Sequence, residues 1–422
     1  MKRYDVLVAG GGLAGIGAAI AAAREGLRVL LIEKNCHLGG AASNALVNPF
    51  MRFYLRRTDE NGNETRELLN AGIFGEILRR LRECGGMNEK SINRFNVEHL
   101  KLLLEVMCEE YRVDLLYDTV LTSATVTDGF VRSVQLFNRD GISIVEASYF
   151  VDCTGDANLA VAAGVPCRIG RESDGLCQPM TLSFWIAGVD IPEFRRCKKE
   201  INDTYRDYQR RGLIQNPRER IHVYEHMAPG VLHFNTTRVV GMNPTSAEDM
   251  TKAQLTARKQ VLELYSFLKE SFPCFSGAEL LMTAPEIGVR ESRMIDGDYL
   301  YTAEDILNYR QFEDSVACGN YDVDIHNPSG TGTEVVALDP SRYYTIPYRS
   351  LIPKGVRNLL VAGRCISSTH EAQSAYRIMP IVCNIGEGAG AAIACAYRAK
   401  GTVRDVQLTE LHALLDRHGA RY

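Results

Sequence analysis

Closely paired cysteines are missing from this chain, although it contains twelve cysteines. They are scattered from Cys36 to Cys395, and no two of them have the C-x-x-C spacing. Iron–sulfur clusters and structural zinc sites need closely grouped thiolates, so we expect neither kind of metal centre. Free, mostly buried thiols in a reducing compartment are the simplest explanation, which predicts a cytoplasmic protein.

A strong charge of either sign and a long uncharged apolar run are missing as well. The net charge is −4 over 422 residues, and no uncharged run reaches the ~20 residues that span a bilayer. Basic pairs at residues 56–57 and 195–196 are flanked by acidic or polar residues, as on a solvated surface. We therefore expect a small-molecule substrate, with neither nucleic acid nor membrane as partner, and leave a homo-oligomer open.

The first forty residues have the order strand, glycine-rich turn, helix, strand, acidic residue. Residues 4–9 and 28–32 are apolar and predict strands, and the alanine-rich residues 16–24 predict the helix between them. The turn at residues 10–15 reads GGGLAG, which fits the pattern G-x-G-x-x-G. This order is that of a dinucleotide-binding unit.

The three glycines of that pattern have separate roles in dinucleotide binding. Gly10 allows the tight turn, Gly12 lets the backbone approach a pyrophosphate, and Gly15 lets the helix pack close to the strand. The helix N-terminus offers free N–H groups to the phosphates, and Glu33 can accept hydrogen bonds from ribose hydroxyls. A second such unit is missing from the chain, which argues against a separate nicotinamide domain.

The residues after Glu33 favour FAD over NAD. A glycine pair, Gly39 and Gly40, follows this acid, and Ala41 and Ala42 come next. Small residues let the backbone lie along an extended cofactor. The arrangement resembles the large FAD-dependent oxidoreductase superfamily that includes glutathione reductase, succinate dehydrogenase and fumarate reductase. The missing cysteine pair argues against its disulfide-reductase branch. The chain most resembles the succinate dehydrogenase-like branch.

Two later segments carry the same resemblance. Residues 148–156 are a strand that runs into a Thr-Gly-Asp turn, which resembles the second fingerprint of the superfamily. Residues 358–364 are an apolar strand that ends in Gly363, and they resemble the C-terminal fingerprint. Arg364 stands where the superfamily usually has an Asp near the ribityl and phosphate region. An arginine can pair with a phosphate instead.

The resemblance implies noncovalent FAD that is contacted by small residues and a few polar side chains. In the superfamily the chain near Val120 touches the adenine ring. The expected FAD contacts are Gly10, Gly12, Leu13, Ala14, Gly15, Glu33, Lys34, Gly39, Gly40, Ala41, Ala42, Val120, Thr154, Gly155, Asp156, Gly363, Arg364 and Met379. Some relatives attach FAD covalently through a histidine in the neighbourhood of His37, but the surrounding sequence differs from theirs.

The resemblance also implies the fold, an α/β architecture with a Rossmann-like, doubly wound FAD-binding domain and an inserted mixed α/β substrate domain. The expected boundaries are 1–165 and 346–422 for the FAD-binding domain and 166–345 for the inserted domain. Periodicity and turn residues predict the elements in more detail. Helices are expected at 74–84, 96–110 and 247–268, and strands at 113–117, 119–127, 131–138, 143–147, 149–152, 180–186 and 231–237.

Residues 366–380 form a polar stretch before an apolar helix, and we expect this loop to line the flavin ring. Arg377 and His370 are its candidate catalytic residues, because a His and an Arg in the corresponding loop of dicarboxylate-handling relatives bind substrate carboxylates. Their spacing here differs from that of the relatives. Hydrogen bonds that hold the loop in place are the alternative role for both side chains.

Two more side chains are candidates outside this loop. Arg290 either faces the cleft or forms an ion pair with Glu286 or Glu291. His326 is a candidate acid or base near neutral pH.

These observations predict an FAD-dependent oxidoreductase that transfers a hydride between flavin N5 and a carbon centre of a small polar metabolite. The alternative from another class is a non-catalytic or electron-relay flavoprotein subunit of a larger redox complex. A tRNA-modifying flavoprotein is a weaker alternative, because the chain is shorter than those enzymes and is not basic.

Overall fold

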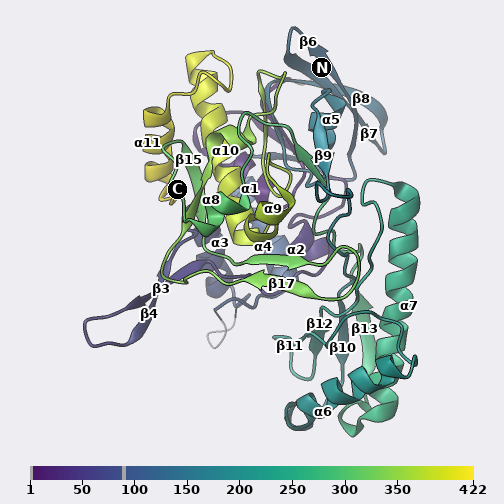
Figure 1. Ribbon diagram of the computed structural model, residues 1–422. Coiled ribbons are helices and arrows are strands. Elements are labelled where there is room, and N and C mark those ends of the chain that lie inside the picture. Colours follow the sequence, from purple (N-terminus) through teal and green to yellow (C-terminus); the bar gives the residue numbers. More distant parts are fainter. Residues whose placement is uncertain (1–2, 88–91) are drawn as a thin grey trace.

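A seven-stranded sheet lies at the centre of the molecule, as the computed structural model shows for residues 3–87 and 92–422 (Figure 1). Five strands are parallel, in the order β5-β2-β1-β8-β19, and β8 also pairs with an antiparallel meander of β7 and β6. The strands are β1 (Arg3–Ala9), β2 (Val29–Ile32), β5 (Asp114–Leu116), β6 (Val120–Thr127), β7 (Phe130–Asn138), β8 (Gly141–Asp152) and β19 (Leu359–Val361). The predicted α/β fold is confirmed.

Strand β8 joins the two kinds of pairing. Its first half pairs with β7 and its second half pairs with β1, and Glu146 belongs to both ladders. The sequence predicted two strands here, 143–147 and 149–152, and that prediction was wrong. Val145, Ala147 and Tyr149 are all buried, so the alternation of the strand continues through Ser148 without a break.

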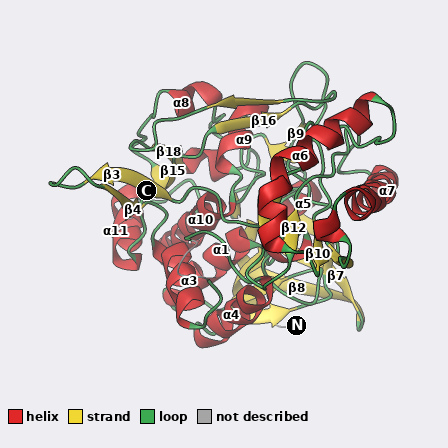
Figure 2. Cartoon of the chain, turned by 90° about the horizontal axis from the view of Figure 1, so that it is seen from below, coloured by secondary structure: helices red, strands yellow, loops and turns green. Residues whose placement is uncertain are grey.

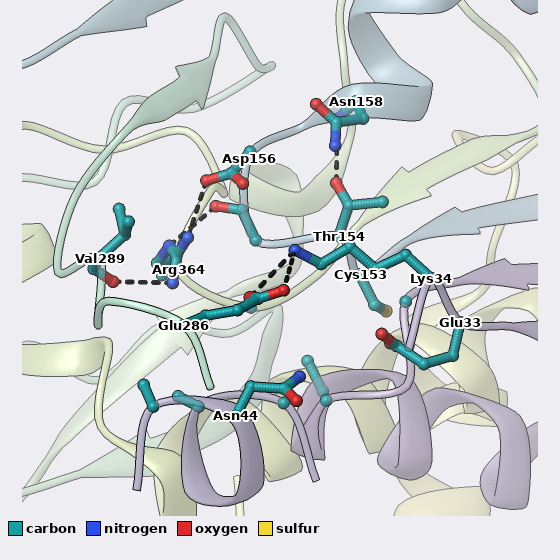
Figure 3. A pocket seen from close by; sticks show the side chains of 18 of the residues that line it. Glu33, Lys34, Asn44, Cys153, Thr154, Asp156, Asn158, Glu286, Val289 and Arg364 are labelled. Carbon is teal, nitrogen blue, oxygen red and sulfur yellow. Dashed lines mark hydrogen bonds and ion pairs between the residues drawn. The ribbon is translucent and has the colours of Figure 1, made fainter. Parts of the chain in front are cut away.

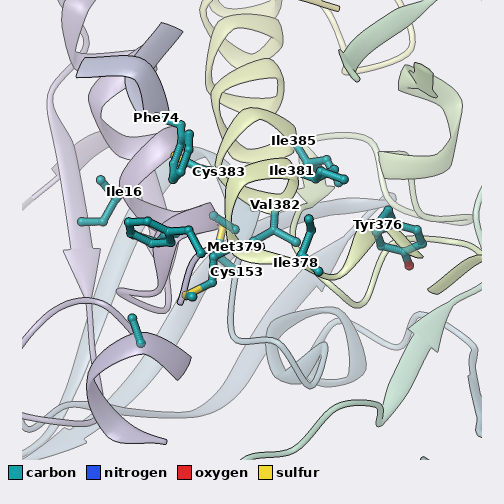
Figure 4. Close-up of a cluster of buried hydrophobic side chains, with 14 of the residues drawn as sticks. Ile16, Phe74, Cys153, Tyr376, Ile378, Met379, Ile381, Val382, Cys383 and Ile385 are labelled. Carbon is teal, nitrogen blue, oxygen red and sulfur yellow. The ribbon is translucent and has the colours of Figure 1, made fainter. Parts of the chain in front are cut away.

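Helices α1 and α10 pack against each other beside this sheet (Figure 2). Their backbones come very close, because a Cβ atom at Gly386 of α10 would lie 1.9 Å from the Ala14 carbonyl oxygen of α1. Figure 4 shows Val382 and Cys383 of α10 among Ile16 and Phe74 of the neighbouring helices. The helices of this part are α1 (Leu13–Arg24), α2 (Ala41–Asn44), α3 (Gly72–Glu83), α4 (Val97–Glu110), α5 (Asn158–Ala162), α9 (His370–Tyr376), α10 (Met379–Ala399) and α11 (Leu408–His418).

By length and composition α10 could cross a bilayer, but its whole apolar window is buried inside the protein. It therefore has the position of a core helix in a globular domain.

A second sheet of four antiparallel strands, in the order β11-β12-β10-β13, forms a separate lobe with two long helices (Figure 1). Its elements are β10 (Phe184–Ala187), α6 (Ile191–Arg210), β11 (Val223–Glu225), β12 (Leu232–Phe234), α7 (Ala247–Ser271), the 3-10 turn η1 (Pro273–Phe275) and β13 (Glu279–Thr283). The strands predicted at 180–186 and 231–237 are shorter than expected. Met180 and Thr181 leave β10 and form single bridges to Val239 and Gly288.

The sequence did not predict α6. Charged residues fill half of this helix, and only Phe194, Ile201 and Tyr205 are buried. The helix begins at Asp190, whose side chain accepts a hydrogen bond from Glu193 N. So few apolar positions give a weak helical periodicity, and the sequence of α6 therefore resembles that of a solvated loop.

The remaining strands form two-stranded pairs. They are β3 (Tyr54–Thr58) with β4 (Glu64–Leu68), β9 (Cys167–Ile169) with β14 (Arg293–Ile295), β15 (Ser315–Gly319) with β18 (Tyr344–Pro347), and β16 (Val323–His326) with β17 (Thr333–Val336). Helix α8 (Ala303–Leu307) and the 3-10 turn η2 (Tyr348–Leu351) complete the chain. Strand β15 packs on α10 and β16 on α9, so the range 293–347 contacts helices that belong with the seven-stranded sheet. The domain boundaries stay a prediction.

Glu387 is a buried carboxyl group in the middle of α10. Its Oε2 atom accepts hydrogen bonds from Ile73 N at 3.0 Å and Asn384 Nδ2 at 3.2 Å. The Oε1 atom has no hydrogen-bond partner among the described residues and lies 3.9 Å from Arg24 Nη1. Burial raises the pKa of Glu387 to about 7.

We expect Glu387→Gln to remove a pH dependence of stability. Because the folded pKa of about 7 exceeds the ordinary value of 4.5, the folded protein holds an extra proton between these values, and stability falls as pH rises through them. From about pH 5 to about pH 8 the variant should gain about 2 kcal/mol of unfolding free energy relative to the wild type. Urea unfolding followed by circular dichroism at both pH values measures this, with the exposed Glu60→Gln as control. Parallel pH profiles of the Glu387→Gln variant and the wild type would contradict the assignment.

Candidate functional site

A cavity of about 290 Å³ opens at the carboxyl ends of β1, β2, β8 and β19. This edge of a parallel sheet is where doubly wound folds bind ligands. The lining includes these predicted FAD contacts: Gly10, Gly12, Leu13, Ala14, Glu33, Lys34, Gly39, Gly40, Ala41, Val120, Thr154, Gly155, Asp156, Gly363, Arg364 and Met379. Gly15 and Ala42 lie behind this surface. That the lining residues contact FAD stays a prediction.

The N-terminus of α1 faces this cavity without a cap. Its first turn has no acidic residue, and no side chain accepts a hydrogen bond from its N–H groups. A Cβ atom at Gly12 would meet only Gly40 Cα, at 3.7 Å, so the surface here is backbone and open space. A Cβ atom at Gly15 would lie 1.8 Å from the Gly10 carbonyl oxygen, which explains why Gly15 packs inside the turn. The free N–H groups and the space suit a pyrophosphate.

Glu33 follows β2 directly and is held by backbone donors. Its Oε2 accepts from Gly11 N at 2.6 Å, and its Oε1 accepts from both nitrogens of Asn35 at 3.0 Å. A carboxylate has further lone pairs, so Glu33 can still accept hydrogen bonds from ribose hydroxyls. Its neighbour Lys34 forms an ion pair with Glu286 at 2.9 Å (Figure 3).

Arg364 connects several segments of the cavity wall (Figure 3). Its guanidinium group donates to Asp156 Oδ1 at 2.7 Å, to the Gly155 carbonyl oxygen at 2.9 Å and to the Val289 carbonyl oxygen at 2.8 Å. This ion pair helps to hold the pKa of Asp156 below its usual value, against the effect of burial. The structure thus shows Arg364 tying the Thr-Gly-Asp turn to the 289 segment, and a contact of Arg364 with a phosphate stays a prediction.

The N-terminus of α10 faces the same cavity through Met379 and Val382. No side chain caps this helix, and its first turn contains Pro380, as the sequence predicted. The cavity therefore lies between two uncapped helix N-termini, both of which favour negative charge.

A second cavity of about 150 Å³ adjoins the first and shares part of its lining, including Met379, Arg364 and Arg377. Arg377 Nη2 has only long contacts, 3.3 Å to Gln178 Oε1 and 3.5 Å to the Asp324 carbonyl oxygen. Its buried Nε has no hydrogen-bond partner among the described residues. Arg377 therefore lines both cavities with a guanidinium group that has few short hydrogen bonds.

Arg290 also lines the second cavity. Its Nη1 donates to the Pro179 carbonyl oxygen at 2.5 Å and to Thr181 Oγ1 at 2.8 Å. The sequence left open whether Arg290 faces the cleft or pairs with Glu286 or Glu291. The structure favours the cleft, since Glu286 pairs with Lys34 and Glu291 with His370. Burial and the neighbouring Arg377 hold the pKa of Arg290 well below its usual range.

His326 lines the second cavity, and its role as an acid or base stays a prediction. Burial and the charge of Arg290 lower its pKa below the ordinary value. Its Nδ1 atom accepts from Arg218 Nη1 at 3.2 Å, which places the ring proton on Nε2, 3.6 Å from Asp324 Oδ2.

His370 lines neither cavity, which corrects its prediction as a substrate ligand. It is buried in the first turn of α9, and its Nδ1 lies 2.7 Å from Glu291 Oε1. The predicted loop at 366–380 in fact contains helix α9, and His370 points into the protein. Its contact with Glu291 links α9 to the segment at residue 291. His37 also lies outside both linings. In the part of the chain that is described, no three His, Cys, Asp or Glu side chains group as metal ligands.

Sequence reasoning missed most of the second cavity. Its polar lining also includes Thr181, Ser183, Asn235, Tyr321 and Asp324. These residues come from distant segments and belong to no motif. They can be recognised as cavity residues only once the fold brings their segments together, so the sequence carried no signal for them.

The family of proteins described as FAD dependent oxidoreductase matches residues 5–415 of this chain. The chain belongs to this family of FAD-dependent oxidoreductases. FAD is therefore its cofactor. The residues present fit this group, because the cavity combines two uncapped helix N-termini, a backbone surface at Gly12 and a fixed acid at Glu33.

Individual relatives of this flavoenzyme are more distant. A digeranylgeranylglycerophospholipid reductase of Methanothermobacter thermautotrophicus is 28% identical over 206 residues, 45% of this chain and 48% of that protein. A tRNA uridine 5-carboxymethylaminomethyl modification enzyme of Geobacter sulfurreducens is 34% identical over 149 residues, 32% of this chain and 21% of that enzyme. The matches thus span about half and about a fifth of these proteins.

Among solved structures, a flavin-dependent brominase has a TM-score of 0.50 and 14% identity, with 99% of this chain and 84% of that chain covered. A geranylgeranyl bacteriochlorophyll reductase-like protein of Thermoplasma acidophilum has a TM-score of 0.48 and 12% identity, with 99% and 83% covered. At this identity the first likeness supports the fold alone.

Proposed function

We propose that this flavoenzyme transfers a hydride between flavin N5 and a carbon atom of a small polar metabolite that carries a carboxylate. The bound flavin supplies the redox chemistry, and the chain supplies binding and orientation. The observation that carries the proposal is the second cavity, which adjoins the FAD cavity and is lined by Arg290 and Arg377.

The charges in this cavity favour an anionic ligand. Asp324 is the one carboxylate among its lining residues, whereas Arg290, Arg364 and Arg377 are three guanidinium groups. Arg364 is already paired with Asp156. Asp324 can balance only one of the two remaining guanidinium groups, Arg290 and Arg377, so the cavity keeps one uncompensated positive charge. A ligand carboxylate matches the planar fork of a guanidinium group.

The size of the cavity favours a small ligand. Its volume is about 150 Å³, roughly half that of the FAD cavity beside it. Thr181, Ser183 and Asn235 add neutral polar groups to the lining, which suit hydroxyl or carbonyl oxygens of a metabolite.

We propose further that the enzyme works in the cytoplasm on a free small molecule, without a nucleic acid or membrane partner. The alternative is an electron-relay subunit of a larger redox complex. Turnover by the isolated chain distinguishes the two.

Anaerobic mixing of the FAD-loaded enzyme with small hydroxy, amino and unsaturated carboxylic acids tests the proposal. We expect at least one acid to bleach the oxidised flavin band, or to reoxidise the reduced enzyme, with saturation kinetics. The matching alcohols and amides, which lack the carboxylate, should react far more slowly. Equal rates with the uncharged analogues would contradict the carboxylate, and reaction only in the presence of a partner protein would favour the relay subunit.

A further inference from the structure

Two cysteines of the four-stranded lobe lie side by side, although 77 positions separate them in sequence. Cys197 belongs to α6 and Cys274 to η1, and their Sγ atoms are 3.6 Å apart. Both are free thiols in this structure. A disulfide needs an S–S distance of about 2.05 Å, so a shift of about 1.5 Å would join them.

The surrounding contacts hold the two elements together independently of the thiols. Asp190 N, at the start of α6, donates to the Cys274 carbonyl oxygen at 3.0 Å. The Phe194 and Phe275 rings pack edge to face with centroids 6.1 Å apart. These contacts keep the N-terminal part of α6 beside η1 whether or not the two thiols are joined.

We propose that Cys197 and Cys274 form a reversible disulfide when the protein meets a peroxide. Cys197 is the attacking thiol, since it is partly exposed, whereas Cys274 is 3% exposed. Burial also raises the pKa of Cys274 to about 12, which keeps it protonated until its partner is oxidised.

The chemistry balances with the peroxide as the oxidant. Cys197 Sγ attacks one peroxide oxygen, the O–O bond breaks, and a sulfenic acid and one water form. Cys274 Sγ then attacks the sulfenic sulfur, and the leaving hydroxide takes the thiol proton as a second water. Two thiols lose two electrons and two protons in total. Held 3.6 Å away, Cys274 has a high effective concentration for the second step.

The disulfide would close a loop that contains one residue of the lining of the second cavity. The chain between the two cysteines includes β12, α7 and Asn235, which lines the second cavity. A cross-link restricts the unfolding of such a loop. In a reducing compartment the bond would be transient, as redox-sensing disulfides are.

Treatment of the full-length, FAD-loaded protein with hydrogen peroxide tests this inference. After alkylation of the remaining thiols, peptide mapping without reduction should show Cys197 joined to Cys274, and dithiothreitol should separate the two peptides. Oxidation should raise the Tm by roughly 5 °C, reversibly. In Cys274→Ser, dimedone should trap Cys197 as its sulfenic acid.

The exposed Cys36 and Cys84 serve as internal references. If these two oxidise while Cys197 stays free for alkylation, the proposal is overturned. It is equally overturned if Cys197 is oxidised but links to another molecule instead of Cys274. Neither result depends on the identity of the substrate.

Discussion

Gly12→Val lowers the affinity for FAD by about 100-fold and leaves the apoprotein folded. Gly12 has a φ of −70° and a ψ of 177°, which a valine adopts without strain. The new side chain would project into the cavity, where only Gly40 Cα lies within 4 Å. It would displace the pyrophosphate from the N–H groups of α1. Loss of two charge-assisted hydrogen bonds costs about 3 kcal/mol, or about two powers of ten in Kd.

Titration of the apoprotein with FAD, followed by flavin fluorescence, measures this change. Gly330→Val is the matched control, because a Cβ at Gly330 meets no atom within 4 Å and Gly330 lines neither cavity. Gly15→Val gives a useful contrast, since its Cβ would collide with the Gly10 carbonyl oxygen and should disturb folding itself. A folded Gly12→Val protein with wild-type FAD affinity would show that the pyrophosphate does not bind at α1.

Arg377→Met weakens the binding of small carboxylates by about 100-fold, while FAD remains bound. Arg377 is largely buried, and its Nε has no hydrogen-bond partner among the described residues. An anion that occupies the second cavity would lie against this guanidinium group and compensate its charge. Truncation of one partner of a buried, hydrogen-bonded charge pair costs about 2–5 kcal/mol.

The binding of malonate and acetate to the FAD-loaded protein, followed by perturbation of the flavin spectrum, measures the effect. Arg349→Met is the control, because Arg349 is half exposed, pairs with Asp314 and lines neither cavity. Arg377→Lys should recover part of the affinity, since it restores the charge without the guanidinium fork. Unchanged carboxylate binding in Arg377→Met would overturn the assignment of the second cavity to an anion.

The sequence identified the FAD-binding unit because that unit is local. Strand, turn, helix, strand and acid lie within residues 3–33, and each position acts through its own backbone geometry or its place at a strand end. Glycine spacing therefore predicted the cavity lining at Gly10, Gly12, Gly39 and Gly40. The choice of FAD and of the fold rested on the resemblance carried by the residues after Glu33 and by residues 148–156 and 358–364.

The chemistry-bearing side chains were harder to place, because a side chain's role depends on its neighbours in space. His370 and Arg377 lie in one sequence stretch, but helix α9 turns His370 toward Glu291 and leaves Arg377 facing the cavities. Burial and the charge of Arg290 lower the pKa of His326, which its sequence position alone does not show. The ion pair of Arg364 with Asp156 likewise appears only in the fold.

By itself, then, the sequence determined the family, the cofactor and the FAD-binding end of the parallel sheet, since these depend on short-range patterns of glycine, apolar and acidic residues. The tertiary structure alone decided the composition of the second cavity and the meeting of Cys197 with Cys274. Both bring together segments that are dozens to hundreds of residues apart. Their contacts arise from the packing of the four-stranded lobe and the β16–β17 hairpin, which no local periodicity specifies.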